Sequence, residues 1–95
     1  MSQQYIGTAR LGTHQSVAYT GTAGTIATAI TSGHNKVRVY VTTDAYIKIG
    51  SSPTATTSDV PLAAKSAEYF TINPGEKVSA IQDASAGTLH VTEVN

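Results

Sequence analysis

The chain has 95 residues and no cysteine, so it is one domain in length and can form neither disulfides nor thiolate metal sites. Six basic and six acidic residues give a formal net charge of zero, which argues against partners held by bulk charge, such as nucleic acid or a membrane surface. No run approaches the roughly 20 apolar residues that a membrane-spanning helix needs.

The first part of the chain has no regular hydrophobic pattern. Residues 1–16 carry scattered apolar side chains without a period of 2 or 3.6, and they are interpreted as an N-terminal arm. Residues 17–95 are predicted to form a single β domain. This domain opens with a strand in which Val17 and Tyr19 share one face, and turn residues follow it.

The next segment, residues 25–31, fits two structures. Ile26 and Ile30 share a face in a strand, but they are also four residues apart, as on one side of a short helix. The alternating Thr and Ala residues favour a strand.

The clearest strand signal lies at residues 36–43. Val37, Val39 and Val41 alternate with polar or amphipathic residues, which is typical of a strand that is buried on one face. After a break at Asp44, residues 45–49 continue the alternation and predict a hairpin or a bent strand.

The second half of the chain contains further short strands. Residues 50–59 hold turn formers and predict an exposed loop, and Pro61 confines residues 60–62 to an edge strand or a non-strand role. Alternation then predicts strands at 68–72, 77–81 and 88–92.

About seven short strands separated by turns indicate an all-β fold, either a small antiparallel β-sandwich or a jelly-roll-like barrel. The residues predicted to face the core are Val37, Val39, Val41, Ile47, Ile49, Phe70, Ile72, Val78, Leu89 and Val91.

The residues that could take part in catalysis or bind a metal ion are dispersed along the sequence. The histidines His14, His34 and His90 lack the spacing that places two imidazoles on one metal ion, and surface positions are expected for them. The carboxylates are isolated in the sequence, so surface positions are expected for them as well. No serine lies in a nucleophile elbow. We therefore expect no catalytic residues, no metal, no cofactor and no enzymatic activity.

A protein interface is the remaining candidate site. The outward tyrosines Tyr40, Tyr46 and Tyr69 could bury area against a protein, stack sugars, or simply cover cross-strand neighbours. The candidate interface comprises these tyrosines and the apolar or basic residues of the arm: Tyr5, Ile6, Arg10, Leu11, Tyr40, Tyr46 and Tyr69.

Four segments together resemble a group of small virion proteins of tailed bacteriophages. They are the strand V-R-V-Y-V-T-T-D at 37–44 with the aromatic hairpin after it, S-P-T-A-T at 52–56, E-Y-F with a P-G turn at 68–75, and G-T-L-H-V-T-E at 87–93. The resemblance covers roughly residues 36–94, and it rests on structural signatures, so it implies no active-site residues.

This resemblance implies a capsid decoration, or cement, protein that binds the major capsid protein or other virion proteins. It would be made in the bacterial cytoplasm and located in the virion. Charged residues form only 13% of the chain, so little opposes self-association, and we expect a homo-oligomer. A trimer is favoured because the resemblance implies a decoration protein, which would sit at the three-fold positions of the capsid. The alternatives are a neck or tail connector, a fibre-associated protein, and a carbohydrate-binding β-sandwich module.

Overall fold

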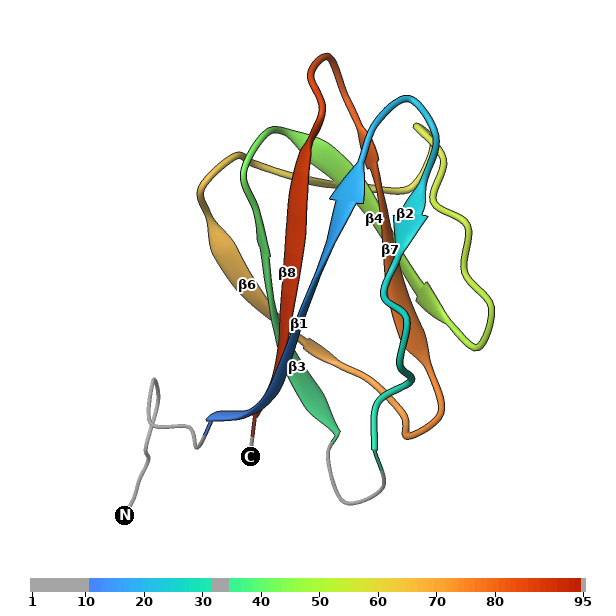
Figure 1. Cartoon of the computed structure of the whole chain (residues 1–95), viewed down its shortest axis with the longest axis vertical. Helices are drawn as coiled ribbons and strands as arrows, with labels where there is room; N and C mark the ends of the chain where they lie inside the picture. Colours follow the sequence, from blue (N-terminus) through green and yellow to red (C-terminus); the bar gives the residue numbers. More distant parts are fainter. Residues whose placement is uncertain (1–10, 32–34, 95) are drawn as a thin grey trace.

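The computed structural model describes residues 11–31 and 35–94, and these residues form two antiparallel sheets of four strands each (Figure 1). No helix that could span a membrane occurs in this part of the chain. The strands are β1 (Leu11–Tyr19), β2 (Gly24–Thr25), β3 (Lys36–Val41), β4 (Ala45–Gly50), β5 (Val60–Leu62), β6 (Ala67–Thr71), β7 (Lys77–Gln82) and β8 (Gly87–Val94). The predicted all-β sandwich is confirmed.

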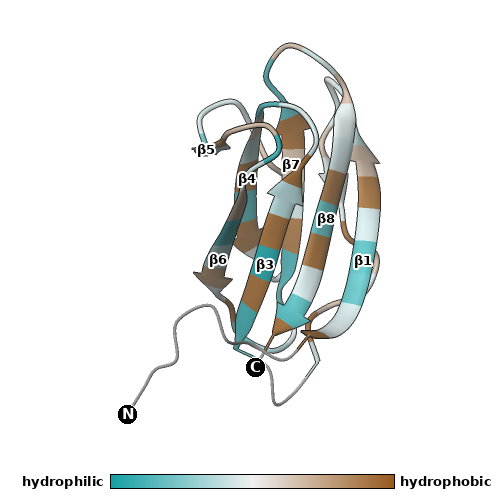
Figure 2. Cartoon of the chain, turned by 90° about the vertical axis from the view of Figure 1, so that its left-hand side faces the viewer, coloured by the Kyte–Doolittle hydropathy of each residue, from teal (hydrophilic) through white to brown (hydrophobic). Residues whose placement is uncertain are grey.

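The strand order is that of a jelly roll. One sheet has the order β1-β8-β3-β6 and the other β2-β7-β4-β5. Each strand of the first half of the chain pairs antiparallel with one of the second half: β1 with β8, β2 with β7, β3 with β6 and β4 with β5. Such pairing results when one long hairpin is rolled up into two facing sheets. Figure 2 looks onto the β1-β8-β3-β6 sheet, with the other sheet behind it.

The core lies between the two sheets. Val37, Val39 and Val41 of β3 are fully buried, as their alternation predicts. All the other residues that were predicted to face inward also lie in the core cluster or pack against it. Tyr19 of β1 is buried with them, and its hydroxyl donates to the main-chain oxygen of Thr43 over 2.7 Å. The prediction of the core from strand alternation is therefore confirmed.

The predicted arm ends earlier than residue 16. Residues 11–16 belong to β1 and pair with β8, and residues 1–10 lie outside the described part of the chain. The hydrophobic pattern fails here because the inward position next to Val17 is the polar Gln15. The side-chain amide of Gln15 donates to the carbonyl of Thr28 and accepts from its N–H, so it is satisfied where it lies.

The strand predicted for residues 25–31 is mostly absent. Only Gly24–Thr25 are in β2, although Ile26 and Ile30 are buried as that prediction required. Their N–H groups donate to the carbonyls of Val78 on β7 and of Glu76, the residue before β7. Gly24 is needed where β1 turns into β2, because a Cβ there would overlap the carbonyl oxygen of Ala18.

The loop predicted as exposed over residues 50–59 is partly buried. Gly50 ends β4, and Pro53 and Ala55 pack inward while their neighbours remain exposed. The N–H of Ala55 donates to the hydroxyl of Ser79 on β7. The following strand, β5, lies at the edge of its sheet as the presence of Pro61 predicts.

Candidate functional site

The outer face of the β1-β8-β3-β6 sheet brings together side chains from four strands. On β3, Arg38 lies directly opposite Tyr69 of β6 on one side and Thr92 of β8 on the other. Tyr40 lies opposite His90 of β8 in the same way. Because directly opposed residues of antiparallel strands point to the same side, these side chains form one surface, which we call the outer face. It faces the viewer in Figure 2.

The outer face carries basic side chains and, within the described residues, no carboxylate. Lys36 and Arg38 alternate with the buried valines of β3 and so point outward. The acidic residues of this sheet, Glu68 and Glu93, lie opposite Val39 and Val37, which places them on the inner side. A chain of zero net charge therefore presents one locally basic surface.

A row of rings crosses the outer face. The guanidinium carbon of Arg38 lies 5.7 Å from the centroid of the Tyr40 ring, a cation–π contact. The Tyr40 ring lies 5.8 Å from the ring of His90, which is in turn 5.4 Å from the ring of His14 on β1. The row ends where His14 Nδ1 meets the hydroxyl of Thr92 at 2.8 Å. The sheet thus holds several hydrogen-bonding and stacking groups in fixed positions.

The residues predicted as an interface do not all meet on this face. Tyr69 is 53% exposed and lies there with the half-buried Tyr40, whereas Tyr46 lies on β4, in the other sheet. A single surface lined by the three outward tyrosines is therefore ruled out. Leu11 is 69% exposed at the start of β1, the edge strand of the sheet. The remaining candidates, Tyr5, Ile6 and Arg10, lie outside the described residues.

The sequence alone did not select Arg38, His14 and His90 for this surface. Alternation placed Arg38 and His90 on outward positions, but nothing local shows that β8 lies between β1 and β3. The residues His14 and His90 are separated by 76 positions in the chain.

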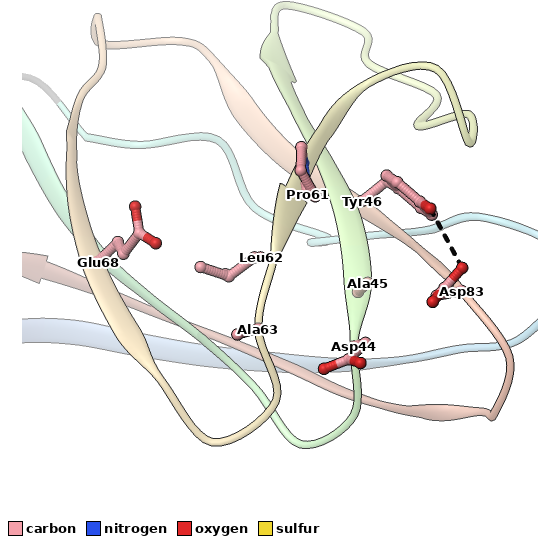
Figure 3. Close-up of a pocket in the computed structure, with 8 residues that line it drawn as sticks. All are labelled: Asp44, Ala45, Tyr46, Pro61, Leu62, Ala63, Glu68 and Asp83. Carbon is pink, nitrogen blue, oxygen red and sulfur yellow. Dashed lines mark hydrogen bonds between the residues drawn. The ribbon is translucent and has the colours of Figure 1, made fainter.

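A second feature is a shallow pocket of about 420 Å³ near the loops that follow β3 and β7 (Figure 3). Asp44, Tyr46, Glu68 and Asp83 contribute its polar side chains. The hydroxyl of Tyr46 donates to Asp83 over 3.1 Å, and this hydrogen bond, followed by the charge of Asp83, raises the pKa of Tyr46.

Asp44 and Asp83 form hydrogen bonds that connect the loops around this pocket. Asp44 accepts a 2.7 Å hydrogen bond from the N–H of Ala64, and the N–H of Asp83 donates to the carbonyl of Asp44. Over residues 11–31 and 35–94, no three His, Asp or Glu side chains are grouped so as to hold a metal ion. Asp44 therefore connects the loop after β3 to the loops after β5 and β7.

Glu93 differs from the surface position that was expected for isolated carboxylates. It is 1% exposed, and its carboxylate accepts a 2.8 Å hydrogen bond from the hydroxyl of Thr31. The bond joins β8 to the segment that follows β2. Glu93 therefore stabilises the contact between these segments and does not contribute to the outer face.

Comparisons with protein families, with curated proteins and with solved structures gave no match for this chain.

Proposed function

We propose that the protein is a non-enzymatic structural protein of a tailed-bacteriophage particle, which decorates the assembled capsid and binds it through the outer face. The observation that carries this proposal is the group formed by Arg38, Tyr40 and Tyr69 on a sheet surface where none of the described residues presents a carboxylate. The resemblance of residues 36–94 to phage virion proteins suggests the kind of partner.

The outer face has the residue types that dominate protein interfaces. Arginine and tyrosine are enriched among the residues that contribute most binding free energy, because both bury a large area and retain a hydrogen-bonding group. Arg38 lies over Tyr40, so its guanidinium is already oriented. The absence of carboxylates from this face, within the described residues, favours an acidic surface on the capsid as the complement.

The scaffold presents this face in a fixed shape. Tyr19 bonds to Thr43, the hydroxyl of Thr43 donates to the carbonyl of Ser85, and the N–H of Thr42 donates to the carbonyl of Thr88. These bonds tie the loop after β3 to β1 and to the start of β8. A surface that is ordered before binding loses less conformational entropy on docking.

The proposed activity needs no chemical step. A protein that binds the assembled capsid but not the dissociated subunits stabilises the capsid by mass action. Many copies on one particle would make modest individual interfaces sufficient. Jelly rolls occur in viral capsid and lectin domains, so the fold is compatible with the proposal, although this support is by analogy.

Two charge-reversal variants, one on each sheet, test whether the protein binds the capsid through the outer face. The assay measures binding to purified capsids of the encoding phage, assembled without the protein. Arg38→Glu should weaken binding at least about tenfold, because it loses the cation and introduces like charge toward an acidic surface. Lys48→Glu is the matched control, since Lys48 is exposed on β4 of the other sheet. Equal losses in both variants, at equal thermal stability, would contradict docking through the outer face.

The number of copies in purified particles tests the location. Quantitative mass spectrometry should find hundreds of copies per particle for a capsid decoration protein. A handful of copies would instead indicate a neck or tail component, and a protein missing from the particles would contradict a virion role altogether.

A further inference from the structure

His14 and His90 form a close pair on the outer face. Their strands, β1 and β8, are adjacent. His14 pairs with Thr92 and Ser16 pairs with His90, so the two histidines occupy diagonal positions on the same side of the sheet. The Nε2 atom of His14 is 3.4 Å from the Nδ1 atom of His90, while the ring centroids are 5.4 Å apart. The two nitrogens therefore lie on the facing edges of the rings, within hydrogen-bond distance of each other.

Thr92 orients one member of the pair. Its hydroxyl lies 2.8 Å from Nδ1 of His14, and Thr92 is only 7% exposed. When Nδ1–H of His14 donates to this hydroxyl, Nε2 carries the lone pair that faces His90. Histidines that ligate metal ions commonly have their second ring nitrogen bonded in this way, which fixes the tautomer and the ring orientation.

The separation of the two nitrogens matches that of two ligands on one metal ion. Tetrahedral zinc with Zn–N bonds of 2.0–2.1 Å places two ligating nitrogens about 3.3 Å apart. The pair at 3.4 Å would thus need little movement to share an ion. The proton on His90 Nδ1 would move to its other ring nitrogen, so both ligands would be neutral imidazoles.

We propose that His14 and His90 form a two-histidine site for a divalent transition-metal ion that prefers imidazole ligands, such as Zn²⁺. Water, or a donor atom from a protein docked on the outer face, completes the coordination. The protein supplies only two ligands, which is consistent with the lack of a group of three possible ligands among the described residues.

Two opposing effects set the affinity of this site. Arg38 and Lys36 lie on the same face, and their positive charges disfavour a bound cation. The two imidazoles are held in place by adjacent hydrogen-bonded strands, so the second ligand binds with a high effective concentration once the first has bound. His14 is exposed, which lets an ion reach the pair directly from solvent.

Titration of the purified chain with Zn²⁺ alone tests the site and does not depend on the proposed virion role. Calorimetry should show one saturable Zn²⁺ per chain. His14→Ala or His90→Ala should each weaken it by about a hundredfold, because one ligand remains and the chelate is lost. Thr92→Val keeps both imidazoles and should weaken binding about tenfold. His34→Ala, which removes the one histidine outside the described residues, is the control for loss of an imidazole and should leave the affinity unchanged.

Two results would overturn the proposal: absence of saturable Zn²⁺ binding by the unaltered protein, or equal affinity in the His34→Ala, His14→Ala and His90→Ala variants. Thermal unfolding without metal must show that the variants are folded. If one histidine variant does not fold, the other and Thr92→Val still decide the outcome.

Discussion

Tyr46 is the residue whose ionisation the structure changes most clearly. Its pKa is raised from the ordinary value of 10.0 by its hydrogen bond to Asp83 and then by the negative charges of Asp83 and Asp44. The folded-state pKa of Tyr46 is higher than its pKa in the unfolded chain. The contribution of the protonated Tyr46 to the stability of the fold is therefore fully present below the ordinary tyrosine pKa. It is lost as the pH rises through the folded-state pKa.

Asp83→Asn should therefore lower the pKa of Tyr46 toward its ordinary value. The amide oxygen can still accept the hydrogen bond, but the negative charge that disfavours the phenolate is removed. The ring signals of Tyr46, followed by NMR through the alkaline range, measure the change. Glu76→Gln serves as the control, since Glu76 is not among the causes of the shift. An unchanged pKa in Asp83→Asn would show that the bond to Asp83 is not formed in solution.

At the scale of elements, the loop between β4 and β5 packs on the side of the β2-β7-β4-β5 sheet that points away from the core. The hydroxyl of Ser79 on β7 accepts from the N–H of Ala55 at 3.0 Å and from the hydroxyl of Thr25 at 3.1 Å. Ser79 and Ala55 are both buried, and the carbonyl oxygen of Pro53, 3.2 Å from the Thr25 hydroxyl, is the alternative acceptor for its single proton. One serine side chain thus joins β7, β2 and the loop.

Ser79→Ala should lower the free energy of unfolding by about 1–3 kcal/mol, because the buried N–H of Ala55 loses its acceptor. Chemical denaturation followed by circular dichroism measures the change. Ser58→Ala is the matched control in the same loop, where the exposed side chain should matter by less than about 0.5 kcal/mol. Equal stability of the two variants would mean that the loop is not anchored by Ser79.

At the scale of the whole molecule, self-association is the expected property. Only 13% of the residues are charged, and large apolar side chains are exposed at Leu11, Val60 and Tyr69. Leu11 starts β1 and Tyr69 is in β6, so both lie on edge strands of one sheet. Exposed apolar groups on a surface of low charge favour association.

Sedimentation equilibrium of the purified chain at two concentrations should give the mass of a trimer. Leu11→Gln should shift the equilibrium toward the monomer, because it removes exposed apolar area at the sheet edge. Lys48→Gln, on the other sheet, should leave it unchanged. A monomer at both concentrations would contradict a trimer that forms without the capsid.

For β3, β4, β7 and β8, the sequence by itself determined that the segment is a strand and which of its faces is buried, whereas it missed the first part of β1 and predicted too long a strand after residue 24. The period of two is local, so the valines of β3 and the alternating residues of β4, β7 and β8 predict their own burial without knowledge of their partners. Pro61 likewise limited residues 60–62 to an edge strand or a non-strand role, because it cannot donate a main-chain hydrogen bond within a sheet, and the structure has the edge strand.

Only the tertiary structure decided which strands are neighbours. The pairing of β1 with β8 brings His14 beside His90, and the separation of β3 and β4 into different sheets places Tyr46 away from Tyr40. Polar inward residues such as Gln15 and Glu93 are satisfied by Thr28 and Thr31, which lie far from them in sequence. Such contacts depend on the whole rolled-up hairpin, so no local pattern of residues can reveal them.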